Sequence, residues 1–503
     1  MNTLLSNKHA RLLLLVFLVI LFIFYANKIN LANADIGRHI KNGEILLKEN
    51  KILGSNFYSY TNPDFPAINH HWAYGAIIYL VWATTGFFGV SLFNIIIYLL
   101  TFLLIFKIAE KKSNYRLAIL FSILALPLIV YRKEVRPEVI SYLLFSIYYF
   151  LLIKYKSQEI NYKILLTSLF LLQILWVNTH IFFIFGIVLV LFFTIDSYLN
   201  YREKTNNLIK LFLVVVLASL VNPYFLSGLL EPFMIFRDYG YLLAENVSIF
   251  FMQKRTFSWF YIYVEALFIL GMISFFVKGN FRQNILNILL FVVFGGLALN
   301  KIRGITLLGF LLVPILSENF KETYWKLNPR KREILRYIML ILFSLAVLIS
   351  LASLNDPGKG LGLLDGVQDS SNFLVENYIQ GNIFNNYDLG GYLIYNLFPD
   401  KMVFVDNRPE AYPVEFFKEV YIPMQEDNEV WERYREEYGI NVIYFYRHDL
   451  TPWAQNFLIE RIKDPLWIPV YVDEYVIIYL EDNEKNKEVI DEYRLPKEMF
   501  VFG

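Results

Sequence analysis

Long runs of apolar residues, each close to the length of a membrane-crossing helix, dominate the first 354 positions of the chain. A helix needs about 20 mostly apolar residues to cross the hydrocarbon core of a bilayer. The pattern predicts about eleven spans, near 11–28, 89–107, 116–131, 137–153, 163–179, 181–199, 208–225, 259–277, 283–300, 303–317 and 334–353. Residues 1–354 are therefore expected to form a polytopic α-helical membrane domain.

A different pattern begins after the last apolar run. Short β-rich runs alternate with helix-like stretches through residues 355–503, which predicts a small soluble α/β domain. The β-rich runs lie at 383–385, 402–405 and 442–446, and 467–472 with 475–480 has the spacing of a hairpin. Helices are expected near 372–379, 389–397, 413–424, 429–438 and 452–463.

The composition excludes several classes of protein. Of the 503 residues, 56% are hydrophobic and only 18% are charged, against roughly 25% charged in soluble proteins, so a soluble multidomain enzyme is excluded. The absence of cysteine excludes disulfides, thiolate metal sites and cysteine nucleophiles. The net charge of +1 combines about −15 in residues 355–503 with about +16 in the remainder.

The charge of the loops predicts the orientation. With about eleven spans, the basic clusters around Lys8, Lys111, Lys156, Lys204, Lys278 and Arg330 all fall on one side, which the positive-inside rule makes cytoplasmic. This agreement requires the apolar stretch 73–88 to be a helix at the outer interface rather than a span. We therefore expect a multi-pass plasma-membrane protein with a cytoplasmic N-terminus and an extracytoplasmic domain at 355–503.

Polar side chains near membrane depth gather on the predicted outer side. Such groups are costly there and are functional candidates by default. They are Asp35, Arg38, His39, His70, His71, Arg132, Lys133, Glu134, Arg136, Glu138, Asn178, His180, Asn222, Arg237, Asp238, Glu245, Lys301 and Arg303. Their shared side predicts one outer pocket at the level of the lipid headgroups.

The first outer loop, at about 29–72, carries the most informative pattern. Its Ile36, Ile40, Gly43 and Leu47 recur at helical spacing, which predicts an amphipathic helix on the membrane surface. Asp35 opens that helix, so its carboxylate suits an N-cap or a general base, and the two roles are compatible.

Each polar motif also has a purely structural interpretation. Residues 70–72, His-His-Trp, suit an interfacial belt, and Arg136 with Glu138 suits an ion pair at a helix start. Residues 178–180 suit a polar turn, and Arg303 suits a membrane anchor. A divalent cation held by Asp35, His70 and His71 is chemically reasonable, although no tight ligand spacing supports it.

Short motifs that occur in order along most of the chain resemble one known family. They are Asp-Ile-Gly-Arg-His-Ile at 35–40 with Gly43, residues 57–63, 70–72, 136–138, 176–180, 222–224 and 301–303, and in the tail residues 381–385, 388–392 and 405–408 with Tyr412. The sequence resembles the lipid-linked-sugar glycosyltransferases of the GT-C fold, a group that includes protein O-mannosyltransferases, aminoarabinose transferases and oligosaccharyltransferases. It looks most like uncharacterised prokaryotic members.

The resemblance implies transfer of a hexosyl or pentosyl group from a polyprenyl-phosphate donor to a glycan, lipid or protein on the outer face. Inversion by one direct displacement is the implied mechanism. Asp35 is then the expected base, and Glu138 is the expected second carboxylate. The donor phosphate is expected to contact Arg136, Arg303, Lys301 and Arg237, and the pocket is expected to include His39, His70, His71, Asn178 and His180.

The chain departs from the family pattern in two respects. Many relatives carry two acidic residues in the first loop, whereas Ala34 and Ile36 flank a single Asp35 here. Several uncharacterised members have His-Glu-Trp where this chain has His-His-Trp at 70–72, so the role of a second carboxylate would pass to Glu138 or Glu134. Compared with oligosaccharyltransferases in particular, the tail segment 386–390 lacks the tryptophans that read a peptide, so sequon recognition is not expected.

Two other functional classes remain open at this stage, and so does a neighbouring enzyme class. A transporter or flippase of a lipid-linked glycan would carry internal repeats and broken helices, which the sequence does not display. A non-catalytic scaffold of a cell-envelope assembly would tolerate exchange of the outer polar residues. A ligase or polymerase of whole glycans is not separated from a transferase by the sequence.

Overall fold

The computed structural model describes residues 2–234 and 237–500, which form two compact units. The first, called the helical unit below, comprises residues 1–27, 91–233 and 243–361. The second, called the mixed unit, comprises residues 28–90, 234–242 and 362–503. Residues 28–90 of the first loop thus pack with the tail, whereas the domain boundary between 354 and 355 stays a prediction.

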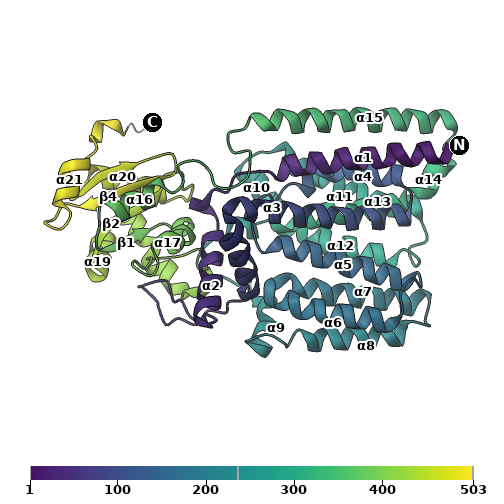
Figure 1. The fold of residues 1–503 in the computed structure, drawn as a ribbon, viewed down its shortest axis with the longest axis horizontal. Coiled ribbons are helices and arrows are strands. Elements are labelled where there is room, and N and C mark those ends of the chain that lie inside the picture. The colour runs from purple at the N-terminus through teal and green to yellow at the C-terminus, as the bar shows by residue number, and fades with distance from the viewer. Residues whose placement is uncertain (1, 235–236, 501–503) are drawn as a thin grey trace. The chain divides into compact units, whose positions relative to one another are not determined.

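The helical unit is a bundle of long helices that lie side by side (Figure 1). Its helices are α1 (Asn2–Tyr25), the second half of α3 (Trp72–Lys112), α4 (Tyr115–Ile129), α5 (Glu138–Lys156), α6 (Tyr162–Thr179), α7 (Ile184–Asn200), α8 (Thr205–Ala218), α9 (Phe225–Met234), α10 (Ile249–Arg255), α11 (Trp259–Lys278), α12 (Ile285–Asn300), α13 (Ile305–Asn319), α14 (Lys321–Lys326) and α15 (Pro329–Ala352). Every predicted span falls on one of them. Seven helical segments in the described chain are long and apolar enough to cross a membrane, which confirms a polytopic helical membrane protein; the number of spans stays a prediction.

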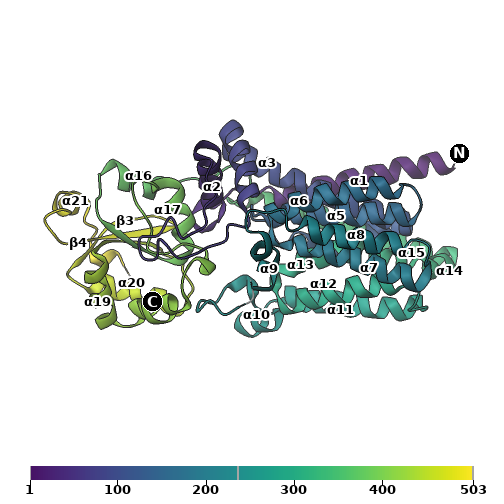
Figure 2. The same cartoon turned by 90° about the horizontal axis from the view of Figure 1, so that it is seen from below.

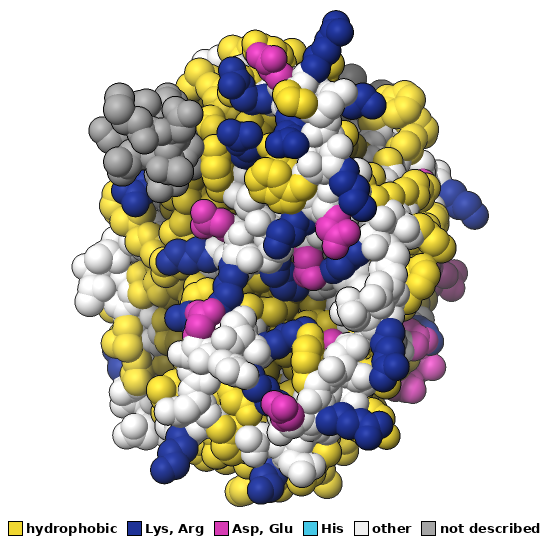
Figure 3. Space-filling model, turned by 90° about the vertical axis from the view of Figure 1, so that its right-hand side faces the viewer, with side chains coloured by type: hydrophobic (Ala, Val, Ile, Leu, Met, Phe, Trp, Pro, Cys, Tyr) yellow, Lys and Arg dark blue, Asp and Glu magenta, His cyan; other side chains and the backbone are white. Residues whose placement is uncertain are grey.

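The basic loops meet at one end of the bundle. Glu318 pairs with Lys112 at 3.0 Å and with Lys278 at 2.6 Å, and Lys156 pairs with Asp196 at 2.7 Å. Figure 3 looks onto this end and shows Lys and Arg side chains in excess over acidic ones. The expected grouping of basic loops is therefore present in the fold, while their cytoplasmic location stays a prediction.

The stretch 73–88 is helical and is separated from the following span by a break. Helix α3 has non-helical backbone angles at Gly86, with φ 63° and ψ −165°. Residues up to Val90 pack with the mixed unit, and residues from Ser91 pack with the helical unit. The break lies close to the predicted boundary at residue 88, and the interfacial position of 73–88 stays a prediction.

The mixed unit contains a four-stranded sheet with the order β1-β2-β4-β3 (Figure 2). Strands β1 (Asn382–Asn385) and β2 (Ile440–Tyr446) are parallel, whereas β4 (Val476–Glu481) runs antiparallel to β2 and to β3 (Trp467–Val472). Its helices are α2 (Ile36–Glu49), the first half of α3, α16 (Asp369–Glu376), α17 (Gly390–Leu397), α18 (Pro423–Glu426), α19 (Asn428–Tyr438), α20 (Ala454–Lys463) and α21 (Lys487–Tyr493). The predicted α/β class and the hairpin are confirmed.

One detail of the predicted tail is wrong. Residues 402–405 form no sheet strand in the described chain, because their backbone pairs with the first loop instead: Val403 N donates to Tyr58 O at 3.0 Å and Tyr60 N donates to Val403 O at 3.1 Å. The helix expected near 413–424 is present, as a π-helix at Phe416–Tyr421 that is followed by the short α18.

Helix α2 begins directly after Asp35, as predicted, but its environment differs from the one expected. Ile36, Ile40 and Gly43 are buried, whereas Leu47 is 44% exposed. A Cβ atom on Gly43 would lie 2.0 Å from Gly75 O, so the face expected on the membrane is covered closely by protein. The hydrophobic period predicts a buried face, but it does not distinguish lipid from protein.

Candidate functional site

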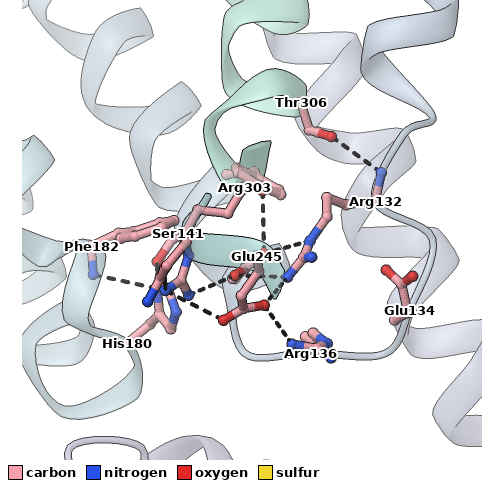
Figure 4. A network of polar contacts seen from close by, with 12 residues as sticks. Arg132, Glu134, Arg136, Ser141, His180, Phe182, Glu245, Arg303 and Thr306 are labelled. Atoms are coloured by element: carbon pink, nitrogen blue, oxygen red, sulfur yellow. Dashed lines mark hydrogen bonds and ion pairs between the residues drawn. The ribbon is translucent and has the colours of Figure 1, made fainter. Parts of the chain in front are cut away.

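The helical unit holds a buried cluster of three arginines and two glutamates, called the arginine cluster below: Arg132, Arg136, Glu138, Glu245 and Arg303 (Figure 4). It lies at the end of α4 and the start of α5, whose other ends carry the basic loops. Arg132 donates to both oxygens of Glu138 at 3.2 and 3.1 Å, and Arg303 Nη2 donates to Glu138 Oε1 at 2.8 Å. Glu138 is 3% exposed. Its carboxylate thus holds two guanidinium groups together.

Glu245 is the second carboxylate of the arginine cluster and comes from the loop between α9 and α10. Its Oε2 accepts from Arg136 at 2.7 Å and from Arg132 at 2.8 Å, and Arg303 lies 3.4 Å from Oε1. Burial alone would raise the pKa of Glu245, but the charges of Arg303, Arg136 and Arg132 outweigh it and hold that pKa well below its usual range. Three guanidinium groups against two carboxylates leave one net positive charge in a buried place.

Arg303 packs against the ring of Phe182, and His180 in turn contacts Phe182. The Arg303 guanidinium lies 5.2 Å from the centre of the Phe182 ring, a cation–π distance. His180 Nδ1 accepts from Phe182 N at 3.3 Å and lies 2.8 Å from Ser141 Oγ. The histidine is 1% exposed. Through these contacts His180 holds Phe182, and the ring of Phe182 packs against Arg303.

The loop that carries Glu245 is fastened to the start of α13. Lys301 Nζ donates to Asn246 O at 2.6 Å, and Arg303 Nη1 donates to Asn246 Oδ1 at 3.3 Å. Among the described residues, Arg303 Nε has no hydrogen-bond partner. Arg303 therefore retains donor capacity toward a further acceptor.

Asn178 lies elsewhere in the helical unit and joins the ends of two helices. Its side chain donates to Ile174 O at 2.7 Å and to Val221 O at 2.9 Å. The polar-turn interpretation is consistent with these contacts.

The mixed unit holds a second set of polar residues, called the Asp35 cluster below: Asp35, Arg38 and Asn407. Asn407 Nδ2 donates to Asp35 Oδ1, and Arg38 Nε donates to Asn407 Oδ1 at 3.0 Å. Asp35 precedes α2, but its side chain makes no capping hydrogen bond, so the N-cap interpretation is wrong. Asp35 is half-buried. A half-buried carboxylate that an amide orients can accept a proton from a ligand.

A buried ion pair fixes the loop that presents Asn407. Arg408 donates to Asp406 through Nε at 2.9 Å and through Nη2 at 2.6 Å, and also to Asn56 Oδ1 at 3.0 Å. Asp406 N donates to Tyr412 Oη at 2.9 Å. Asp406 and Arg408 thus form a buried ion pair, and they hold Asn407 between them.

Glycines let the two halves of the Asp35 cluster approach each other. A Cβ atom on Gly37 would lie 2.7 Å from Gly391 O, and one on Gly391 would lie 3.2 Å from Ala34 O. A Cβ atom on Gly390 would lie 2.3 Å from Asp406 Cα. Gly391 therefore allows close backbone contact with the first loop, and Gly390 allows close contact with the tail segment that presents Asn407.

Three histidines of the mixed unit lie close together. The rings of His70 and His71 are 4.0 Å apart, and His39 meets His71 edge-on at 5.3 Å and Tyr74 at 5.2 Å. Within the described ranges, no group of three His, Cys, Asp or Glu side chains is arranged to hold a metal ion. The divalent cation considered for Asp35, His70 and His71 stays a prediction.

The structure groups the expected site residues by unit. Arg136, Glu138, His180, Lys301 and Arg303 belong to the helical unit, whereas Asp35, His39, His70, His71 and Arg237 belong to the mixed unit. Arg136 pairs with Glu245, and Glu138 pairs with Arg132 and Arg303, so each contacts residues from other parts of the cluster. Arg303 is a buried ion-pair member rather than a membrane anchor.

Sequence reasoning left three contributors outside the expected site. Arg132 and Glu245 were only two of many outer polar residues, and Asn407 was only part of a tail motif. For Asn407, the motif Val-Asp-Asn-Arg at 405–408 was the available signal. No local sequence pattern marks Glu245 as a site residue, because its partners Arg136 and Arg132 lie 109 and 113 positions away.

Comparison with known proteins identifies the fold. No family model and no curated protein matches the sequence. Among solved structures, the chain resembles the archaeal oligosaccharyltransferase AglB from Archaeoglobus fulgidus, in complex with an inhibitory peptide and a dolichol-phosphate, with a TM-score of 0.62 at 8% identity over 95% of this chain and 75% of that one. It also matches the arabinofuranosyltransferase AftD from Mycobacteria, with a TM-score of 0.48 at 11% identity over 95% of this chain and 40% of that one. The AglB likeness shows that the chain has the GT-C fold, as its motifs suggested.

Proposed function

We propose that the protein is a membrane glycosyltransferase that moves a sugar from a polyprenyl-phosphate donor to an acceptor on the outer face of the membrane. The observation that carries the proposal is the arginine cluster at one end of a bundle with the GT-C fold. A buried guanidinium group is costly unless it is paired or has a ligand. An excess of positive charge with an unused Arg303 Nε suits a phosphate group.

The family resemblance supplies the reaction, and each cluster is proposed to take one role in it. Asp35 takes the proton of the acceptor hydroxyl while that oxygen forms a bond to the anomeric carbon. The bond between the anomeric carbon and the phosphate oxygen breaks, and its electron pair leaves on the polyprenyl phosphate. Arg303 and Arg136 stabilise the added negative charge of that phosphate, an electrostatic effect that is strong in a buried place.

Glu138 has a positioning role in this proposal. Its two oxygens accept from Arg132 and Arg303, and a carboxylate held in this way is poorly placed to take a proton from an acceptor. Asp35 is then the single base, which agrees with the motif at 34–36, where Ala34 and Ile36 flank one aspartate.

Glu245 ties the donor site to the loop between α9 and α10. Its carboxylate occupies positions on Arg132 and Arg136 that a phosphate oxygen would also suit. A bound donor phosphate is therefore expected to contact Arg132 and Arg136 together with the Glu245 carboxylate, and not only to displace water from them. The donor sugar, its carrier lipid and the acceptor are assigned only by class: a hexose or pentose, a polyprenyl phosphate, and a glycan, lipid or protein.

Deletion of the gene and mass spectrometry of envelope glycans and lipids test the proposal. We expect one sugar to be lost from an envelope glycan and the wild-type gene to restore it. An Arg282→Lys variant, at an exposed arginine in the loop between α11 and α12, is the control and should restore it too. An Arg303→Lys variant that is present at wild-type level should not restore it, because a lysine cannot keep the paired contacts of a guanidinium. An unchanged glycome would contradict the proposal, and accumulation of a complete lipid-linked glycan on the inner leaflet would indicate a flippase.

A further inference from the structure

The mixed unit has a cavity of about 260 Å³ that shares no residue with the Asp35 cluster. It lies among α18, α19, α20 and the segment that precedes α20. Its lining consists of Met424, Gln425, Glu426, Asp427, Asn428, Trp431, Pro452, Trp453, Asn456, Phe457, Glu460 and Arg461. Small-molecule sites typically measure about 300–1,000 Å³, so this cavity suits a single small ring rather than an extended chain.

Arg461 is the unusual member of this lining. It is 3% exposed, and its guanidinium lies 5.1 Å from the centre of the Trp431 ring and 5.4 Å from that of Phe457. Its Nη2 donates to Asn428 Oδ1, but within the described chain its Nε and Nη1 have no hydrogen-bond partner. Burial lowers the pKa of Arg461.

Two further buried polar atoms on the lining residues also lack partners within the described chain. These atoms are Trp431 Nε1 and Gln425 Oε1, on side chains that are 1% and 4% exposed. Most buried polar groups in folded proteins have a partner, and each exception calls for an explanation. The unpartnered atoms of Arg461, Trp431 and Gln425 therefore lie behind the cavity surface, on residues that line it.

The charge around the cavity excludes an anionic ligand. Glu426, Asp427 and Glu460 line the cavity. Glu432 and Asp464 lie 3.9 and 3.7 Å from Arg461 Nη1. These carboxylates outnumber the single guanidinium, so a phosphate or a carboxylate would meet net repulsion.

We infer that this cavity binds one ring of a neutral saccharide. Sugar hydroxyl groups both donate and accept, which matches the exposed amides of Asn428 and Asn456 and the exposed carboxylate of Glu460 on the lining. The half-buried Trp453 beside Pro452 offers an aromatic face to the C–H face of a sugar ring. Only the assignment of that sugar to the acceptor glycan rests on the proposed function.

Ligand-observed NMR with the full-length protein in detergent micelles tests the inference. The probes are neutral trisaccharides of mannose, glucose, galactose and arabinose, with a glucuronic acid trisaccharide and an uncharged hexapeptide for comparison. We expect at least one neutral saccharide to bind and Trp453→Ala and Glu460→Gln to weaken it by about tenfold or more. Arg461→Met should do the same, and the exposed Arg433→Met on α19 is the matched control.

Binding is measured apart from transfer, which separates this inference from the proposed function. Asp35→Ala should bind the neutral saccharide as the wild type does, even though it is expected to transfer no sugar. The inference is overturned if no neutral saccharide binds, if only the acidic saccharide or the peptide binds, or if folded Trp453→Ala and Glu460→Gln proteins bind as tightly as the wild type.

Discussion

Asn407 donates a hydrogen bond to the Asp35 carboxylate across 372 positions of sequence. The same amide accepts from Arg38 at 3.0 Å, so its orientation is fixed: nitrogen toward Asp35 and oxygen toward Arg38. The tail thereby sets the position of the residue that we assign as the base. The tail domain therefore orients the Asp35 carboxylate and is more than a cover.

Asn407→Ala is expected to lower the turnover number of sugar transfer by about ten- to a hundredfold, because a slightly misplaced base loses alignment with the acceptor hydroxyl. The acceptor KM should change little. Asn377→Ala, which removes a half-buried asparagine of the same unit that donates to Phe373 O at 2.9 Å, is the control. A turnover number and pH profile equal to those of the wild type in Asn407→Ala would exclude the positioning role.

Glu138→Gln is expected to lower the free energy of unfolding by about 3–5 kcal/mol, because it leaves Arg132 and Arg303 buried without their shared carboxylate. Thermal unfolding of the purified protein in detergent measures the effect. Glu159→Gln, at a 45% exposed side chain that pairs with Lys111, should cost less than about 1 kcal/mol. Equal unfolding temperatures for the two variants would refute the structural role of Glu138.

The lowered pKa of Glu245 predicts a defined dependence of stability on pH. A carboxylate with a depressed folded pKa contributes stability that is fully present above its unfolded pKa, about 4.3, and is lost as the pH falls below it toward the folded value. The unfolding temperature of the wild type should therefore fall more steeply below about pH 4.3 than that of Glu245→Gln. If the unfolding temperatures of the wild type and Glu245→Gln fall in parallel between pH 7 and pH 3, ionisation of Glu245 does not contribute to stability in this way.

Single cysteines test the orientation, because the natural chain has none. A cysteine at the exposed Glu488 of α21 should react with a membrane-impermeant maleimide in intact cells. A cysteine at the exposed Lys331 at the start of α15 should react only after permeabilisation. The reverse pattern would overturn the predicted sidedness.

The helices were the most predictable part of the fold. An apolar run such as 137–153 must be helical in a membrane whatever its neighbours are. A helix is the only structure in which one segment hydrogen-bonds all of its own backbone N–H and C=O groups. The hairpin of β3 and β4 was equally local. Residues 402–405 have the composition of a strand, but their partner is the first loop at Tyr58 and Tyr60, and a local pattern cannot name a partner.

The candidate site was only partly predictable, for the same reason. Asp35, Arg136 and Arg303 carried motif signals, whereas Glu245 acquires its meaning only from arginines far away in sequence. The proximity of Arg136 and Glu138 in sequence suggested a pair, but it could not indicate that Arg136 also contacts Glu245, 109 positions away. Leu47 fitted the helical period of α2 and is nevertheless exposed.

Release of polyprenyl phosphate by the purified protein in vesicles tests the central claim most directly. The donors are polyprenyl-phosphate mannose and polyprenyl-phosphate arabinose, and an envelope extract supplies the acceptor. The wild type and Asp64→Ala, at an exposed aspartate of the same loop, should release polyprenyl phosphate from at least one donor with matching glycosylation of the acceptor. Asp35→Ala should be slower by about 10²–10⁴-fold. Release by Asp35→Ala at the wild-type rate, or no release by the wild type from either donor, would contradict the account.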